Sequence, residues 1–320
     1  MKVLVVSPLD PSALDRLRAL HDVRQAVNPN LADFRSAIAD RQVVAVRSGV
    51  MISGEVMSAA PDLRLIVRAG SGLDNIDLDH ARSRCIRVVR IPGMSAQPVA
   101  EMTFALLLAL ARNVVTADRQ LRQGHWPKAD LGGPLLRGKT LGVVGAGNIG
   151  GLVGEMAAAW GLRVLGCVGH PNDRVRRSLA ARGITLTDVD TVVADSDVVT
   201  LHVPLDESTR HLVDSEVLDR MRPGSLLVNM ARGGVVDEKA LLEALTHGRT
   251  VAGAALDVHE TEGEGTVSPL ADLDNVVLTP HIGAMALDSQ RLIGERVIEL
   301  VDAFEAGRVE EEVQDGELVL

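Results

Sequence analysis

The stretch "TLGVVGAGNIGGLVGEMAAAW" constrains the fold of this chain more than any other segment. It places three glycines in G-x-G-x-x-G register between an apolar run, which predicts a buried strand, and a proline-free run that predicts a helix. The first glycine of such a loop allows a tight turn, the second lets a phosphate approach the backbone, and the third lets the helix pack on the strand. The first N–H groups of the helix then face a pyrophosphate. The motif therefore predicts a dinucleotide-binding loop at Gly145, Gly147, Asn148, Ile149 and Gly150.

Strand-like apolar runs alternate with helical patterns along almost the whole chain. Four runs precede the glycine loop: "KVLVV", "VVAV", "LRLIVRAG" and "IRVVRIP". Six form a second series: "TLGVVG", "RVLGCVG", "DVVTLHV", "SLLVNMA", "VAGAALDV" and "NVVLTP". This alternation predicts an α/β fold of two Rossmann-like domains, each a doubly wound parallel sheet, with a cleft between them. Aromatic residues make up only 2% of the chain, so the core must be aliphatic, as it is in parallel sheets.

A chain of 320 residues is longer than the ~250 residues at which single cores stop growing. We expect a flavodoxin-like substrate-binding (catalytic) domain at residues 1–98 plus 287–320, and an NAD(P)-binding Rossmann domain at residues 99–286. A long helix is predicted to begin near Val99, in "VAEMTFALLLALARNVVTADRQLRQG". It is apolar all round at its centre, which fits either a subunit interface or burial between the domains of one chain.

The net charge of −10, without a basic stripe, argues against nucleic acid and anionic membranes as partners. No apolar run approaches the ~20 residues of a membrane span. The two cysteines give no disulfide framework, which suits a cytoplasmic protein. His259 and the acids after it are poorly spaced for metal binding, so no metal is predicted. A small molecule is the expected partner.

Three segments of the second series carry polar residues at or just beyond the end of a predicted strand. They are "MARGGVVDE", "AALDVHETE" and "LTPHIGAM". Ligands of open α/β sheets bind at the carboxyl ends of the strands. An arginine, a glutamate and a histidine from these segments could therefore converge beside a bound nicotinamide. Histidine is the side chain that most readily gains and loses a proton near neutral pH.

The chain resembles the D-isomer-specific 2-hydroxyacid dehydrogenases. The matching segments follow the family order over nearly the whole chain: "VRAGSGLDNIDL", "VAEMTFALLLALAR", "GAGNIG", "LHVPLDESTRHLV", "LVNMARGGVVDEKALLEAL", "AALDVHETE" and "NVVLTPHIGA". The resemblance implies an NAD(P)-dependent oxidoreductase that interconverts a 2-oxoacid and a D-2-hydroxyacid by hydride transfer.

The resemblance also implies roles for single residues. His281 would be the general acid/base, Glu262 would pair with it, and Arg232 would bind the substrate carboxylate and polarise the carbonyl. Gly263 stands where the family usually has proline, so the loop around Glu262 departs from the pattern. Asp257 would hold the nicotinamide carboxamide. Further cofactor contacts are implied at His202, Val203, Pro204, Ala231, His281 and Ala284.

The strand after the glycine loop bears on the choice between NAD(H) and NADP(H). Val168 stands where an acidic residue normally accepts hydrogen bonds from the adenosine ribose of NAD. Without that carboxylate nothing repels a 2′-phosphate, and His170 and Arg174 could contact one. Asp173 could instead substitute for the missing acid. The sequence favours NADP(H) and leaves NAD(H) open.

The substrate side of the first domain is predicted from "AVRSGV" and "VRAGSGLDN". Ser71 and Gly72 would present successive backbone N–H groups to the substrate carboxylate. Arg47 resembles a residue that reaches the substrate in phosphoglycerate-type members.

Several positions depart from the phosphoglycerate-type pattern. Met51 replaces a lysine, Met94-Ser95 stands where glycine-asparagine is common, and Met102 stands where histidine often follows "VAE". These changes make the site less attractive to anions, so a 2-oxoacid with a neutral or apolar side chain is expected.

Assembly and two rival functions stay open at this point. The family resemblance implies a homodimer formed through the nucleotide-binding domain. Relatives of this fold also include nucleotide-sensing, corepressor-like binding proteins, which can retain the same three polar residues. A formate- or phosphite-type dehydrogenase is the second rival.

Overall fold

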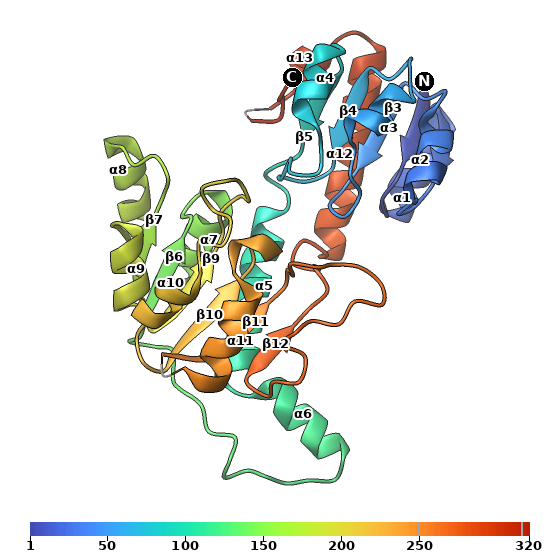
Figure 1. Cartoon of the computed structure of the whole chain (residues 1–320). Helices are drawn as coiled ribbons and strands as arrows, with labels where there is room; N and C mark the ends of the chain where they lie inside the picture. The colour runs from blue at the N-terminus through green and yellow to red at the C-terminus, as the bar shows by residue number, and fades with distance from the viewer. Residues whose placement is uncertain (249, 315) are drawn as a thin grey trace. The chain divides into compact units, whose positions relative to one another are not determined.

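The computed structural model describes residues 1–248, 250–314 and 316–320. The chain divides into two compact units (Figure 1): Met1–Ser95 with Ala284–Leu320, and Ala96–Gly283. The sequence placed the two boundaries after residues 98 and 286.

The first unit contains a parallel sheet of five strands in the order β2-β1-β3-β4-β5. This is the flavodoxin-like order of doubly wound sheets. Its elements are β1 (Lys2–Val5), α1 (Pro11–Leu20), β2 (Asp22–Gln25), α2 (Leu31–Ile38), β3 (Val43–Val46), α3 (Gly54–Ser58), β4 (Leu65–Arg68), α4 (Leu78–Ser83), β5 (Arg87–Arg90), α12 (Leu287–Glu305) and α13 (Val309–Glu312).

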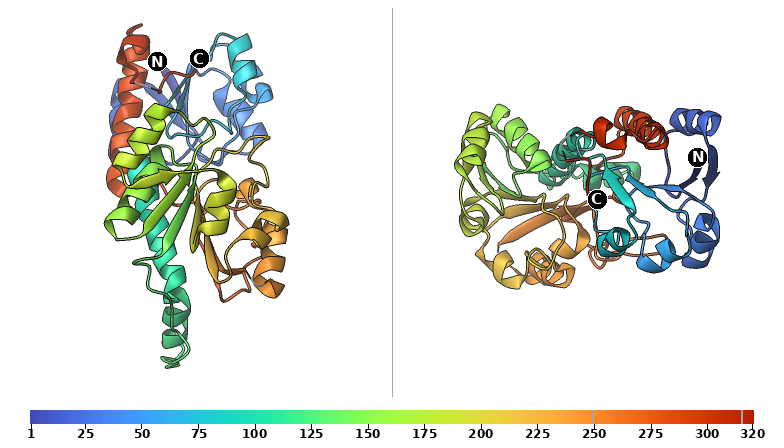
Figure 2. Two further views of the ribbon diagram at one scale, coloured as in Figure 1. Left: turned by 90° about the vertical axis from the view of Figure 1, so that its left-hand side faces the viewer. Right: turned by 90° about the horizontal axis from the view of Figure 1, so that it is seen from above.

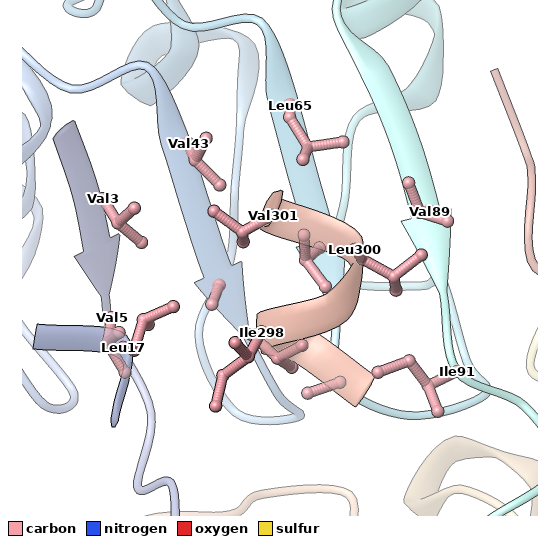
Figure 3. Packing of buried hydrophobic residues seen from close by; sticks show 14 of the residues in the cluster. Val3, Val5, Leu17, Val43, Leu65, Val89, Ile91, Ile298, Leu300 and Val301 are labelled. Atoms are coloured by element: carbon pink, nitrogen blue, oxygen red, sulfur yellow. The ribbon is translucent and has the colours of Figure 1, made fainter. Parts of the chain in front are cut away.

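The first unit has a hydrophobic cluster on each face of its sheet, and one of them lies against α12. Figure 3 shows Ile298, Leu300 and Val301 of α12 among valine and leucine side chains of the strands. Val43 and Leu65 from the central strands are fully buried there. The buried residues of this cluster are aliphatic, as expected from composition, and Phe304 packs against them.

The second unit contains a parallel sheet of seven strands in the order β12-β11-β10-β9-β6-β7-β8. Helices cover both faces of this sheet (Figure 2). Its elements are α5 (Ala96–Ala111), α6 (Val114–Arg122), β6 (Thr140–Val144), α7 (Asn148–Ala159), β7 (Arg163–Cys167), α8 (Asp173–Ala181), β8 (Ile184–Leu186), α9 (Val189–Asp195), β9 (Val198–Leu201), α10 (Ser215–Arg220), β10 (Ser225–Asn229), the 3₁₀ turn η1 (Gly233–Val235), α11 (Glu238–His247), β11 (Val251–Leu256) and β12 (Val276–Leu278).

The order of the strands reverses between β6 and β9, since β7 and β8 lie on one side of β6 and the later strands on the other. In doubly wound sheets this switch point is where ligands bind, outside the carboxyl ends of the strands. The predicted α/β fold with two parallel sheets is confirmed.

Two strands were missing from the prediction because they carry little apolar pattern. β2 reads "DVRQ" and is largely exposed at one edge of the first sheet. β8 has only three residues and forms one edge of the second sheet. An edge strand needs neither the length nor the continuous apolar run of a central one.

The single long helix predicted from Val99 is wrong, because the segment forms two helices. α5 and α6 are bent by 62° at a break next to Asn113, whose backbone takes a left-handed φ of 53°. The Asn113 side-chain amide donates to the carbonyl of Gly132 at 3.0 Å, which anchors the bend. Among the described residues no single helix has the length and apolar content of a membrane span; α5 and α6 meet those criteria only together, across their bend.

Candidate active site

The glycine loop follows β6 as predicted, and its glycines meet different surroundings. Gly145 has a φ of +92°, and a Cβ there would lie 2.7 Å from the carbonyl oxygen of His202. A Cβ on Gly150 would lie 2.3 Å from the carbonyl oxygen of Gly145. A Cβ on Gly147 would meet no heavy atom of the described chain within 4 Å. The first and third glycines are therefore needed by the fold, whereas the second faces open space.

The open space lies at the N-terminus of α7. Gly147 is the N-cap residue, and within the described chain no side chain caps this end of the helix. The first N–H groups of the helix, from Asn148 and Ile149, are therefore available to an anion, and the helix dipole favours one. The loop and helix end thus fit the pyrophosphate of a dinucleotide.

The end of β7 lacks the acidic residue that would bind an adenosine ribose. Val168 follows the strand directly and is only partly exposed. His170, Asp173 and Arg174 are all exposed, at or near the start of α8. The side chain of Asn172 caps α8 by accepting from the N–H of Val175 at 3.0 Å.

His202, Val203 and Pro204 follow β9, beside the glycine loop. The backbone N–H of His202 donates to the carbonyl of Val144 at 2.8 Å. Its ring Nε2 lies 3.0 Å from the hydroxyl of Thr200, and among the described residues its buried Nδ1 has no hydrogen-bond partner. Burial lowers the pKa of His202 to about 3, so the ring is neutral.

Arg232 follows β10 in a turn that a buried asparagine holds in place. The Asn229 side chain accepts from the N–H of Ala231 at 3.0 Å and donates to the carbonyl of Arg232 at 3.0 Å. Nη1 of Arg232 donates to the carbonyl of Ala231 at 2.7 Å. The sequence pattern alone does not distinguish Asn229, although this asparagine ends the strand in the motif "LVNMARG".

His281 and Glu262 are brought together, as predicted. Nδ1 of His281 lies 2.9 Å from Oε2 of Glu262. Burial raises the pKa of Glu262, but the hydrogen bonds from His281 and from the N–H of His259, together with the electrostatic attraction of these two rings, hold the pKa below its ordinary value. His281 has a φ of 54°, a conformation that non-glycine residues rarely adopt and that recurs at functional sites.

Asp257 fixes the backbone around His281. This carboxylate is 2% exposed. One oxygen accepts from the Thr279 hydroxyl at 2.6 Å and from the N–H of Ile282 at 2.9 Å, and the other accepts from the N–H of Gly283 at 2.7 Å. Asp257 thus ties β11 to the turn after β12. Its contact with the nicotinamide carboxamide stays a prediction.

The catalytic residues predicted in the second unit share one edge of the sheet. Arg232 follows β10, Glu262 follows β11 and His281 follows β12, and these three strands are neighbours. The glycine loop and His202 follow β6 and β9 at the same carboxyl edge. Among the described residues no group of three or more His, Cys, Asp or Glu side chains could hold a metal ion.

The substrate residues predicted in the first unit also lie at a carboxyl edge. Arg47 follows β3, and Ser71 and Gly72 lie just beyond the neighbouring β4. Burial lowers the pKa of Arg47, and its buried Nε has no hydrogen-bond partner in the described part of the chain. The hydroxyl of Ser71 donates to the carbonyl of Pro92 at 2.9 Å.

Ala284 belongs to the first unit by its contacts. Its carbonyl accepts a hydrogen bond from the side-chain amide of Gln290. The cofactor contact that the family resemblance implies for Ala284 stays a prediction.

Comparison with known proteins assigns the chain to a family and agrees with its fold. Residues 104–283 match the family model described as "D-isomer specific 2-hydroxyacid dehydrogenase, NAD binding domain". The chain is 38% identical to hydroxypyruvate reductase of Thermotoga maritima over 304 residues, which cover 94% of this chain and 97% of that protein. It is 39% identical to D-3-phosphoglycerate dehydrogenase of Methanocaldococcus jannaschii over 98% of its own length, but it spans only 59% of that longer protein. The crystal structure of D-lactate dehydrogenase from Aquifex aeolicus, in complex with NAD and lactic acid, superposes with a TM-score of 0.88 at 29% identity, covering 100% of this chain and 99% of the other.

Proposed function

We propose that this chain, which belongs to the D-isomer-specific 2-hydroxyacid dehydrogenase family of NAD-dependent oxidoreductases, reduces a 2-oxoacid to the D-2-hydroxyacid with His281 as general acid. The observation that carries the proposal is the 2.9 Å contact between His281 and Glu262 at the sheet edge that also holds the glycine loop. A histidine that is paired through Nδ1 keeps Nε2 for the reacting oxygen.

His281, Glu262 and Arg232 have different roles in the proposed reaction. The reduced nicotinamide, when bound, supplies the hydride. His281 donates a proton from Nε2 to the carbonyl oxygen of the substrate, and Glu262 stays ionised and orients the ring. Arg232 binds the substrate carboxylate and stabilises charge on the carbonyl oxygen through its planar set of donors. In the direction of oxidation His281 takes the proton back.

We propose that the substrate is a small 2-oxoacid with an uncharged side chain. Met51 is 57% exposed in the segment after β3, where it adds apolar rather than cationic surface. Arg47, half-buried with an unpartnered Nε among the described residues, is the candidate to meet the anionic end of the substrate. Hydroxypyruvate fits these requirements, and it is the oxoacid in the name of the Thermotoga relative.

For the cofactor we propose a preference for NADP(H) over NAD(H). The support is Val168 at the end of β7, together with the exposed side chains of His170 and Arg174 near the start of α8. A 2′-phosphate would meet cationic groups there and no carboxylate from the strand. Asp173 lies in the first turn of α8 and is the residue that could favour NAD(H) instead.

For assembly we propose a homodimer formed through the second unit. α6 has no buried residue, and Val114, Val115 and Leu121 on it are each more than 50% exposed. Trp126 and Leu135 in the following segment are 79% and 72% exposed. These exposed apolar side chains on α6 and in the segment after it would be buried if a second copy of the chain packed against them. Light scattering on the wild type and on Leu121→Glu tests this: a dimer and a monomer are expected, and a monomeric wild type would refute it.

The test of the reaction is a panel of 2-oxoacids with NADH or NADPH, following loss of the reduced-nicotinamide absorbance. The panel holds glyoxylate, hydroxypyruvate, pyruvate, branched and aromatic 2-oxoacids, and phosphohydroxypyruvate, and chiral chromatography identifies the product enantiomer. We expect the highest kcat/KM with an uncharged side chain and a D product. Turnover of phosphohydroxypyruvate above all others would contradict the substrate proposal, and an L product would contradict the reaction proposal.

A further inference from the structure

Glu238 is a buried carboxyl group that the mechanism above does not use. It is the first residue of α11 and is 3% exposed. The preceding residue, Asp237, already caps the helix by accepting from the N–H of Ala240 at 3.0 Å. Glu238 instead accepts from the backbone N–H of Glu260 at 2.8 Å, in the segment that follows β11. Burying a carboxyl group costs free energy, so we looked for a role of Glu238 in its contacts.

His259, next in the chain to Glu260, joins this segment to the segment that carries His281. Its ring Nε2 lies 3.0 Å from the carbonyl oxygen of Thr279, and because a carbonyl only accepts, Nε2 carries the proton. Its Nδ1 is buried, has no hydrogen-bond partner among the described residues, and lies 3.9 Å from Oε1 of Glu238. The ring therefore lies between the Glu238 carboxyl and the end of β12.

The main chain of His259 in turn orients Glu262. The backbone N–H of His259 donates to Oε1 of Glu262 at 3.2 Å, while Oε2 of Glu262 meets Nδ1 of His281 at 2.9 Å. On its carbonyl side, His259 is packed so closely that a Cβ on Gly233 would lie 1.9 Å from its oxygen. A displacement of His259 would therefore also displace the Glu262 carboxylate, which pairs with His281.

We propose that Glu238 and His259 are positioning residues that hold Glu262 in place against His281. This inference rests on the acid–base role proposed for His281. Glu238 fixes the backbone of Glu260, His259 fixes the same segment against Thr279, and the N–H of His259 then sets the orientation of the Glu262 carboxylate. Neither residue touches the reacting atoms.

The expected size of the effect follows from how strongly catalysis depends on geometry. A displacement of about 1 Å at a reacting group can cost ~10²-fold in rate. Removing the Glu238 carboxyl leaves the Glu262–His281 contact possible but no longer fixed, so we expect kcat to fall by roughly 10-fold to 100-fold. Because the glycine loop lies at other strands, the Kd for the reduced cofactor should change far less than kcat.

The first measurement concerns geometry and does not depend on turnover. Hydrogen–deuterium exchange is followed in peptides that cover residues 258–262 in the wild type, Glu238→Ala and Glu238→Gln. Loss of the acceptor for the Glu260 amide should speed exchange in Glu238→Ala. Glutamine keeps a side-chain carbonyl oxygen that can accept from the N–H of Glu260, so Glu238→Gln should retain protection. Unchanged exchange in Glu238→Ala would overturn the proposal.

The second measurement concerns rate, with hydroxypyruvate and the preferred cofactor. Glu238→Ala should lower kcat far more than it weakens binding of the reduced cofactor, and Glu238→Gln should restore most of the lost rate. Glu243→Gln, on the same helix but exposed, is the matched control and should behave like the wild type. In a Glu262→Gln background, Glu238→Ala should cost little more, because the residue that it positions is already altered. Independent, multiplying losses in the double variant would overturn the proposal, since they indicate a general structural effect.

A second pair of variants keeps the test decisive if Glu238→Ala does not fold. His259→Phe fills the space of the ring without a donor, whereas His259→Gln retains one for the Thr279 carbonyl. Faster exchange at residues 258–262 and a lower kcat in the first but not the second are expected, and equal behaviour of the two would overturn the role of His259. If no 2-oxoacid is turned over by the wild type, the proposed function fails, while the exchange measurements still decide whether Glu238 and His259 hold this segment.

Discussion

Replacing Gly147 or Gly150 with alanine adds the same methyl group at two positions of one loop and should give opposite results. At Gly147 the added Cβ meets no atom of the described chain within 4 Å, so alanine causes no clash; the backbone there, at φ −83° and ψ −143°, lies outside the regions that alanine prefers, so a small loss of stability is expected. In the proposed cofactor site, that space is where a pyrophosphate would approach the N–H groups of α7. A charge-assisted hydrogen bond contributes about 1.5–3 kcal/mol, so losing one should raise the Kd for NADH or NADPH about 10-fold to 150-fold.

At Gly150 the added Cβ would lie 2.3 Å from the carbonyl oxygen of Gly145, so the backbone must shift. Alanine is otherwise the better helix residue, and any destabilisation must come from this contact. Overpacking of this kind costs about 1–3 kcal/mol, which for a unit of this size lowers Tm by roughly 2–12 °C. Fluorescence titration with NADH and NADPH, and thermal unfolding of both variants, measure the two effects. If Gly147→Ala lowers Tm while leaving the Kd unchanged, the loop is a structural turn and the dinucleotide assignment is refuted.

Three further predictions concern the cofactor, the acid–base pair and the substrate. Val168→Asp should raise the Kd for NADPH at least about 10-fold more than that for NADH, because the new carboxylate repels a 2′-phosphate; equal changes in the two titrations would contradict the cofactor proposal. For Glu262, whose pKa is lowered from its ordinary 4.5, the paired carboxylate stabilises the folded state above that pH, and the stabilisation is lost as the pH falls through the lower folded value. In urea unfolding, the stability difference between the wild type and Glu262→Gln should therefore be full at neutral pH and shrink below pH 4.5; a difference that does not depend on pH would contradict the pairing. Arg47→Gln should raise the KM for the 2-oxoacid by roughly 10-fold or more, since a charged hydrogen bond is lost, with cofactor Kd unchanged; an unchanged KM would remove Arg47 from the substrate site.

The sequence predicted the fold where local pattern and tertiary position agree. The central strands are continuous aliphatic runs that are buried on both faces, so β6 and β10 were found with nearly correct bounds. β2 and β8 are edge strands whose pairing depends on a neighbour distant in sequence, which no local pattern records. The break between α5 and α6 was missed because its signal is one asparagine that adopts a left-handed conformation.

The candidate site could be predicted to the same extent. Arg232 and His281 stand out because they are polar residues just beyond apolar strands, whereas Glu262 was chosen among the nearby acids through the family resemblance; the structure places Glu262 and His281 in contact. The residues that hold them were not found. Asn229 is the last residue of a strand, and Glu238 lies in a helix, where a carboxyl looks like an ordinary surface residue. Their roles depend on contacts with Arg232 and Glu260 that only the folded chain reveals.

The most direct test of the central claim, that His281 is the proton donor, is the kcat of His281→Asn with the best 2-oxoacid of the panel. Asparagine suits this position, because His281 has a φ of 54° and asparagine adopts left-handed conformations readily. We predict that kcat falls by about 10²–10⁴-fold, the usual contribution of a general acid, while the variant stays folded. A variant that turns over within a few-fold of the wild type would show that the proton comes from elsewhere, and the account of this site would be wrong.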